Sequence, residues 1–384
     1  MEHIKGFKNC RILTENSIER TNLIIKNGII DHIGSAECEG LTELDDDRLV
    51  IPGFIDQHVH GASGCDTMDG TEQAIGTIAA SLAREGVTAF LATTTTQSRE
   101  SLTAALGAVK AYMQSKPDSG AEVLGVHLEG PFISKAFAGA QLPEHIANPD
   151  AEAFLHYQKA SGNSIRLVSM EVETDAALSL IPLLAESGVV VSIGHSNATY
   201  NEVERAVKAG ARCVTHTYNA QSALHHREVG VVGAAMLLDK LYCEAICDGI
   251  HLSPPAVRLL WKSKPKDKLI LISDALRAKN MPNGRYTELG GQETVVEGGV
   301  ARLTDGTLAG SVLRMNDAVK NAAAFLGTDL AETVRFATEN PAKNLGVFDR
   351  MGSIAVGKAA NLAVVDDALR VYRTVRNGKT IFSI

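Results

Sequence analysis

The middle of the chain alternates apolar, strand-like segments with helical ones, and this alternation constrains the fold most. Eight segments have the composition of buried strands: 50–60, 87–95, 122–129, 165–171, 189–195, 211–216, 241–248 and 269–274. Most stretches between them have helical periodicity, for example 72–84, 99–113, 176–185 and 202–209, and many end at a glycine suited to a helix C-cap. The pattern predicts an α/β fold, a TIM-like (β/α)8 barrel whose active site lies where the strands end.

The two ends of the chain have another pattern, with short strands around tight turns. Segments 22–26 and 29–33 flank Asn27-Gly28, a turn signal of the primed hairpin type. Segments 360–365 and 371–375 repeat this style near the other end. Neither end has enough strands to be stable alone, so we expect residues 1–50 and 348–384 to form one small β-sandwich domain beside a barrel of residues 51–347.

Composition excludes several classes of partner. A net charge of −8 argues against a nucleic-acid or acidic-membrane partner, so a small anionic ligand would need a local basic site. No run approaches the about 18 apolar residues of a membrane span, and the N-terminus lacks a signal-peptide core. The 6 cysteines are scattered without a Cys-x-x-Cys pair, which indicates reduced thiols and a cytoplasmic protein.

The first barrel strand ends in two histidines, His58 and His60, one residue apart. Side chains at i and i+2 of a strand share a face, so both imidazoles point to one place beyond the strand end. A pair of this kind is a chance pair about as often as it is a ligand pair. Its interpretation therefore depends on partners elsewhere.

Residues of metal-binding type also end four other predicted strands: Glu129, His195, His216 and Asp274. Residues placed by chance on the surface or in the core would not be expected to lie at the same level of the barrel. Four imidazoles and two carboxylates suit one divalent transition metal, or two that share a carboxylate.

Several motifs resemble those of the N-acetylglucosamine-6-phosphate deacetylases, within the amidohydrolase superfamily. They are VHLEGPF at 126–132, GHSNA at 194–198, THTYNA at 215–220, LHHRE at 224–228, DGIH at 248–251 and SDA at 273–275. The resemblance runs over nearly the whole chain. It implies metal-dependent hydrolysis of the 2-acetamido group of N-acetylglucosamine 6-phosphate, which yields acetate and glucosamine 6-phosphate.

The resemblance also implies a metal site. The metal ligands of the family fall on Glu129, His195 and His216, and some members lack the His-x-His pair and keep one metal. Because this chain has both His58 and His60, we expect two metals bridged by Glu129, with Asp274 completing the first site. Zinc and iron both accept such ligands. Asp274 would act as general base and then as general acid.

Substrate contacts implied by the resemblance are Ala140, Gln141, Asn219, Ala220, Arg227, His251, Leu308, Ala309 and Gly310. Gln141 stands where the family has a histidine, and we expect it to hydrogen-bond a sugar hydroxyl. Arg227 and His251 would bind the phosphate across the interface of a homodimer. Gln221-Ser222-Ala223 and Val229 depart from the family and loosen the loop that carries Arg227.

Long connections at 132–148 and 275–311 are expected to form lids or substrate walls, the second with a hairpin around 297–299. His127 is expected to be a core histidine or one that supports a metal ligand from behind, and His145 and His225 are expected to be solvated or structural. Two alternatives stay open. One is the same hydrolysis of N-acetylgalactosamine 6-phosphate, and the other is a non-catalytic assembly protein on the same scaffold, which would be expected to lose ligands.

Overall fold

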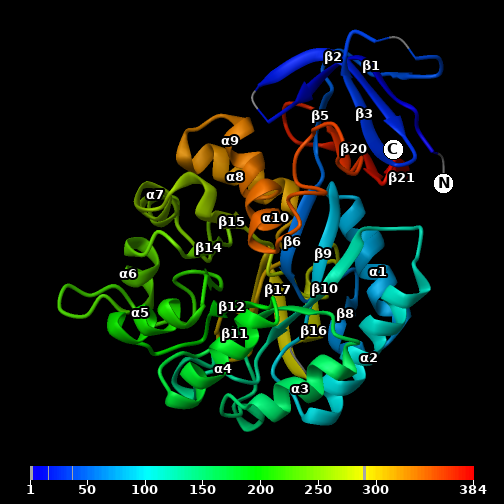
Figure 1. Cartoon of the computed structure of the whole chain (residues 1–384). Helices are drawn as coiled ribbons and strands as arrows, with labels where there is room; N and C mark the ends of the chain where they lie inside the picture. Colours follow the sequence, from blue (N-terminus) through cyan, green and yellow to red (C-terminus); the bar gives the residue numbers. More distant parts are fainter. Residues whose placement is uncertain (1–2, 16, 37, 289–290) are drawn as a thin grey trace.

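A computed structural model describes residues 3–15, 17–36, 38–288 and 291–384, and Figure 1 shows a barrel beside a smaller sheet. Eight parallel strands form the barrel in sequence order. They are β6 (Phe54–Val59), β9 (Val87–Thr93), β10 (Glu122–Glu129), β11 (Ile165–Met170), β12 (Val190–Ile193), β13 (Cys213–Val214), β14 (Tyr242–Ala245) and β15 (Leu269–Leu271). A parallel bridge between Val59 and Ala275 closes the ring between its first and last strands. The predicted (β/α)8 barrel is thus confirmed.

A helix follows each barrel strand and covers the outside of the ring (Figure 1). These helices are α1 (Glu72–Ala83), α2 (Arg99–Ser115), α3 (Ala151–Ala160), α4 (Asp175–Glu186), α5 (Tyr200–Ala209), α6 (Gly230–Leu237), α7 (Pro254–Ser263) and α8 (Met315–Leu326), followed by α9 (Leu330–Phe336) and α10 (Glu339–Asn344). Polar N-caps set several starts: at α5, Thr199 and Glu202 form a reciprocal capping box. In the described part of the chain, no helix combines the length and the apolar character needed to cross a membrane.

The two chain ends pair in one mixed sheet, as expected from their patterns. Its strands are β1 (Gly6–Leu13), β2 (Ile18–Lys26), β3 (Ile29–Gly34), β4 (Thr42–Glu43), β5 (Leu49–Pro52), β19 (Leu362–Val365), β20 (Val371–Arg376) and β21 (Lys379–Ser383). The ends join where β5 pairs with β1 on one side and with β19 on the other. Asn27 and Gly28 make the predicted turn between β2 and β3, both with positive φ. The division into domains at residues 51 and 347 stays a prediction.

The expected single strand 50–60 is wrong, because the structure divides it at Gly53. Residues before this glycine form β5 in the small sheet, and residues after it form β6 in the barrel. A Cβ on Gly53 would lie 2.1 Å from Cγ2 of Thr88, so a side chain does not fit where the chain passes from one sheet to the other. The apolar run by which the strand was predicted continues across the break, from Leu49–Pro52 to Phe54 and Ile55, so it does not mark the division.

The barrel interior changes from apolar to polar along the strands. Towards their N-terminal ends, Ile55, Leu91 and Leu167 belong to one buried cluster, which includes Ala342 of α10. Two residues further along three of the strands, the buried side chains are Gln57, Thr93 and Ser169. Side chains at i and i+2 share a face, so the polar groups form the next layer of the interior. This layer supports the residues at the strand ends.

The long connection after β15 contains a three-stranded antiparallel sheet. The predicted hairpin is β17 (Gln292–Glu297) and β18 (Val300–Leu303), with Glu297 paired to Val300 around the Gly298-Gly299 turn. A third strand, β16 (Gly284–Glu288), was not predicted because its sequence has no apolar alternation. Nε2 of Gln292 donates a hydrogen bond of 2.5 Å to the backbone oxygen of Ala140, so this sheet contacts the long connection after β10.

Candidate active site

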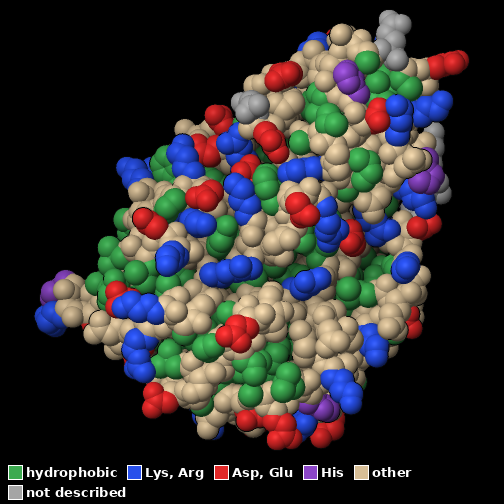
Figure 2. Space-filling model, in the orientation of Figure 1, with side chains coloured by type: hydrophobic (Ala, Val, Ile, Leu, Met, Phe, Trp, Pro, Cys, Tyr) green, Lys and Arg blue, Asp and Glu red, His purple; other side chains and the backbone are tan. Residues whose placement is uncertain are grey.

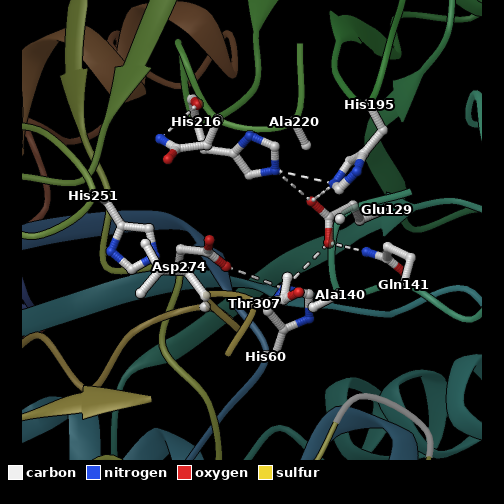
Figure 3. Close-up of a pocket in the computed structure, with 14 residues that line it drawn as sticks. His60, Glu129, Ala140, Gln141, His195, His216, Ala220, His251, Asp274 and Thr307 are labelled. Carbon is white, nitrogen blue, oxygen red and sulfur yellow. Dashed lines mark hydrogen bonds and ion pairs between the residues drawn. The ribbon is translucent and has the colours of Figure 1, made fainter. Parts of the chain in front are cut away.

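The six residues of metal-binding type from the sequence lie together at the C-terminal end of the barrel, in two groups of three. His58, His60 and Asp274 form the first group, and Glu129, His195 and His216 form the second. Within each group the ligand atoms lie within 4.8 Å of one another. Figure 3 shows five of these side chains converging from different strands. Parallel strands end at one edge, which brings together residues far apart in the sequence.

Glu129 lies between the two groups. Its Oε1 is 3.4 Å from Nε2 of His58 in the first group and 3.2 Å from Nε2 of His216 in the second. Its Oε2 is 3.3 Å from Nε2 of His60. The carboxylate therefore contacts histidines of both groups.

Three of the six residues have left-handed backbone conformations at the strand ends. The φ angles are 48° for His195, 27° for His216 and 48° for Asp274. Non-glycine residues adopt this region at a cost of about 1–3 kcal/mol, and such residues cluster at functional sites. The sharp change of direction turns each side chain into the mouth of the barrel.

The donor atoms fit divalent metal ions. Nε2 of His58 is buried and, among the residues that the structure describes, has no hydrogen-bond partner. It lies 3.3 Å from Oδ1 of Asp274, in the middle of the first group. A buried nitrogen that makes no hydrogen bond, although carboxylates lie close to it, is suited to bind a metal.

The histidines and carboxylates of the two groups shift one another's pKa values and so favour each other's charged forms. Burial opposes protonation of His60, but Asp274 and Glu129 outweigh it and raise its pKa to about 10. Burial likewise opposes ionisation of Glu129, yet the neighbouring histidines, His58 above all, hold its pKa well below the ordinary value. The same balance, with His58 and His60 as the cations, lowers the pKa of Asp274. Both carboxyl groups are therefore ionised at neutral pH.

A cavity of about 230 Å³ opens above these residues (Figure 3). The predicted substrate contacts that line it are Ala140, Gln141, Asn219, Ala220, His251, Leu308 and Gly310. Gly139 and Thr307 also line it, and neither was predicted as a contact. Ala309 does not line it and is buried with Leu276 and Val296, next to Ala140, so its place in the substrate wall stays a prediction.

Gln141 is mostly engaged by protein groups. Its amide oxygen accepts hydrogen bonds of 2.7 Å from Oγ1 of Thr95 and from the backbone N–H of Thr96. These two bonds orient the amide so that Nε2 donates to Oε2 of Glu129 at 2.7 Å. One N–H of the amide remains for substrate, so the contact with a sugar hydroxyl stays a prediction, while the structure shows that Gln141 also orients Glu129.

The structure separates the two residues expected to act across a subunit interface. His251 lines the cavity of its own chain, where Oδ2 of Asp248 holds its Nδ1 at 2.6 Å, so its assignment to a neighbouring site is wrong. Arg227 is exposed in the loop before α6 and does not line the cavity. Its guanidinium contacts Nε2 of His226 at 2.9 Å.

The other histidines lie as expected. His127 is fully buried and belongs to neither metal-type group; its Nε2 is 2.7 Å from Oγ of Ser169, and its ring packs edge-on against His58. His145 is half-buried in a short 3-10 helix, and His225 is exposed.

Sequence reasoning missed Glu244, a fully buried acid of β14. Its Oε2 is 3.1 Å from Nδ1 of His58. The available signal was an acid in the middle of the otherwise apolar segment 241–247, where a buried charge needs a partner.

Comparisons with known proteins agree with this arrangement. Residues 49–381 match the amidohydrolase family. The chain is 39% identical to an N-acetylglucosamine-6-phosphate deacetylase of Bacillus subtilis (strain 168), over 98% of this chain and 96% of that protein. It is 37% identical to an N-acetylgalactosamine-6-phosphate deacetylase of Escherichia coli O157:H7, over 94% and 95% of the two chains. An N-acetylglucosamine-6-phosphate deacetylase from Mycobacterium smegmatis, solved with N-acetyl-D-glucosamine 6-phosphate, has a TM-score of 0.93 and 29% identity over 100% of both chains.

Proposed function

The chain belongs to the amidohydrolase family, and on that premise we propose that it hydrolyses the acetamido group of N-acetylglucosamine 6-phosphate to glucosamine 6-phosphate and acetate. The observation that carries the proposal is the pair of three-residue groups joined by Glu129 at the floor of the cavity. The relative from Bacillus subtilis supports the proposal, because its similarity covers 98% of this chain.

We propose that His58, His60 and Asp274 hold one divalent metal, zinc or iron, and that His195 and His216 hold a second. Glu129 would bridge the two, because its carboxylate contacts histidines of both groups. When bound, such metals supply Lewis-acid polarisation of the amide carbonyl and a nucleophilic water that ionises near neutral pH.

The residues of this chain would then move the proton that the reaction requires. Asp274 lines the cavity and is ionised at neutral pH, so it can accept a proton from the attacking water. The amide C–N bond breaks as the same carboxyl group returns that proton to the departing nitrogen. Acetate and a free amine result, and Asp274 ends as it began.

Phosphate recognition is proposed to need a second copy of the chain. Asn219, Ala220 and His251 line the cavity and offer polar groups, but the phosphate carries two negative charges. Arg227 lies on a loop that projects from the barrel (Figure 1), and the tip of the projection carries basic and histidine side chains in Figure 2. We therefore propose a homodimer in which Arg227 enters the site of the neighbouring subunit.

Kinetics on the two epimeric sugar phosphates test the substrate. We expect a higher kcat/KM for N-acetylglucosamine 6-phosphate, with release of acetate and a primary amine in equal amounts. Because the Escherichia coli relative named for the galacto epimer is 37% identical, N-acetylgalactosamine 6-phosphate is the second candidate. A higher kcat/KM for that epimer would replace the first assignment.

Metal analysis separates an enzyme from a non-catalytic assembly protein on the same scaffold. All six residues of the two groups are present, so we expect up to two metal equivalents per chain and hydrolysis that chelators abolish. A protein that binds no metal and releases no acetate would favour the assembly role.

A cytoplasmic location, proposed from the scattered cysteines, is supported by 6 free thiols, of which 4 are buried.

A further inference from the structure

Glu244 connects the polar layer of the barrel interior to the metal-type residues above it. The side chain is fully buried on β14. Its Oε1 accepts a hydrogen bond of 2.6 Å from Nε2 of Gln57, whose own amide oxygen accepts from Nδ2 of Asn344 at 3.1 Å. Its Oε2 lies 3.1 Å from both Nδ1 of His58 and the backbone nitrogen of His216. One carboxylate thus contacts a residue of each group.

This contact determines which nitrogen of His58 carries the proton. Both oxygens of Glu244 accept hydrogen bonds from other N–H groups, those of Gln57 and His216, so Nδ1 of His58 acts as the donor in this contact. When Nε2 gives up its proton to a metal, its lone pair therefore faces the space beside Asp274 and Glu129. Among the described residues Nε2 makes no hydrogen bond, and the groups beside it are the carboxylates of Asp274 and Glu129, which would share a metal with it.

The other three histidines lack such a partner. Nδ1 of His195 is 2.8 Å from a neutral acceptor, the backbone oxygen of Phe137. In the described part of the chain, Nδ1 of His60 and Nδ1 of His216 have no hydrogen-bond partner. A charged acceptor therefore supports one histidine of the first group and none of the second. This asymmetry should make the two metal positions respond differently to a change at residue 244.

We infer that Glu244 is a positioning residue of the first metal site: its carboxylate holds the His58 ring in place and strengthens Nε2 as a ligand. The inference rests on the proposed two-metal site, but not on the identity of the sugar. Carboxylates behind ligating histidines raise ligand basicity, and their loss lowers metal affinity about 10- to 100-fold. A buried carboxylate among neutral amides is also costly unless positive charge matches it, and the first metal would supply that charge.

The test measures metal binding rather than hydrolysis. Metal-free protein is equilibrated with a series of buffered Zn²⁺ concentrations, and the metal equivalents per chain are counted. The wild type should load in two steps, and the step lost in His60→Ala identifies the first site. In Glu244→Gln the first-site dissociation constant should rise about 10- to 100-fold, while the second-site step stays at its wild-type position.

A double variant that exchanges the residues at positions 57 and 244 separates the effect of the charge from the effect of packing. In Glu244→Gln alone, the new amide N–H₂ would face Nε2 of Gln57, which lies 2.6 Å from the replaced oxygen, so two donors would meet. The double variant Gln57→Glu/Glu244→Gln restores an acceptor there and keeps one buried carboxylate, but leaves His58 with a neutral partner. We expect it to recover the thermal stability of the metal-free protein while the first site stays weak.

The outcomes distinguish this inference from the proposed function. Wild-type first-site affinity in the swapped variant, or in a folded Glu244→Gln, would overturn the inference and leave the hydrolysis standing. A wild type that loads no metal at the first site would overturn both. If Glu244→Gln does not fold, the swapped variant decides by the same measurement.

Discussion

At the scale of single residues, Asp274 has the position that amide hydrolysis requires. Its Oδ1 lies 3.3 Å from Nε2 of both His58 and His60, and its side chain lines the cavity. The histidines keep the carboxyl group ionised, so it can accept a proton at neutral pH. A proton carrier and a metal ligand are thus combined in one side chain.

Replacing this carboxylate should remove the proton transfer and spare the fold. For Asp274→Asn we expect kcat to fall about 10²- to 10⁴-fold, the typical contribution of general acid–base catalysis, with little change in KM. Steady-state kinetics and circular dichroism measure the two effects. A variant that keeps more than about a tenth of wild-type kcat would show that another group is the base.

Glu129 is the residue expected to couple the two metals. Glu129→Gln should lower metal content at both sites, because the neutral amide is a poorer ligand and contacts histidines of both groups. Metal equivalents counted after gel filtration test this. Glu171→Gln is the matched control, since Glu171 is a buried acid just beyond β11, outside both groups. Full occupancy in Glu129→Gln would refute the bridge.

Gln141 should act through Glu129 rather than through the sugar. Gln141→Leu removes the bond of 2.7 Å to Oε2 of Glu129, so we expect a loss of about 10- to 100-fold in metal affinity or activity. If Gln141 instead served mainly as a sugar contact, the variant would raise KM and leave metal affinity unchanged. Gln73→Leu, an exposed change on α1, controls for the substitution itself.

At the scale of elements, the loop before α6 is separate from the cavity of its own chain. Its residues His225, His226 and Arg227 are exposed, and a single antiparallel bridge between His225 and Glu228 braces it. The base of the loop is anchored, because Gln221 is buried and Oγ of Ser222 donates a hydrogen bond of 2.6 Å to the backbone oxygen of Ala198. The expectation that segment 221–223 loosens the loop is therefore wrong for its base, and the exposed residues are confined to the tip. A basic loop of this kind is suited to contact an anion held elsewhere.

Arg227→Ala should therefore raise KM for the phosphorylated sugar strongly and change turnover of unphosphorylated N-acetylglucosamine little. The reason is that the arginine pairs with the phosphate and not with the acetamido group. Arg205→Ala, an exposed arginine of α5, is the matched control.

Subunit mixing tests whether the arginine acts across the interface. Arg227→Ala is mixed with Asp274→Asn under conditions of subunit exchange. If Arg227 acts in the neighbouring site, one site of each heterodimer carries both defects and the other carries neither, so activity partly returns. Heterodimers without recovered activity would place Arg227 in the site of its own chain.

At the scale of the whole molecule, metal binding should change how stability depends on pH. In the metal-free protein the pKa of His60 is raised from 6.5 to about 10. A raised pKa stabilises the fold fully below the unfolded value and loses that contribution as pH rises through the folded value. We expect the melting temperature of metal-free protein to fall between about pH 7 and pH 10.

The melting temperature of the metal-loaded protein should fall less over the same pH range, because the metals take the place of the protons on the histidines. Thermal unfolding with and without chelator measures both curves. His60→Ala, which lacks the titrating group, should show a smaller slope when metal-free. An equal slope in wild type and variant would mean that His60 does not control this dependence.

The sequence by itself determined the features that depend on local periodicity. Alternating strand and helix patterns predicted the barrel, and the helices 72–84 and 202–209 match α1 and α5 within two residues. It also placed six metal-type residues at strand ends, and parallel strands that end at one edge bring such residues together. The family motifs identified the chemistry for the same reason, since each is a short continuous segment.

Only the tertiary structure decided which side chains meet across the barrel. Glu244 and His58 are 186 residues apart, and neither segment signals the other. The same holds for two contacts made by loop residues. His251 lines the cavity of its own chain, and Gln141 donates a hydrogen bond to Glu129. Gly53 divides one apolar run between two sheets because Thr88 leaves no room for a side chain. Periodicity reports which face of an element is buried, whereas contacts between elements follow from how those faces pack.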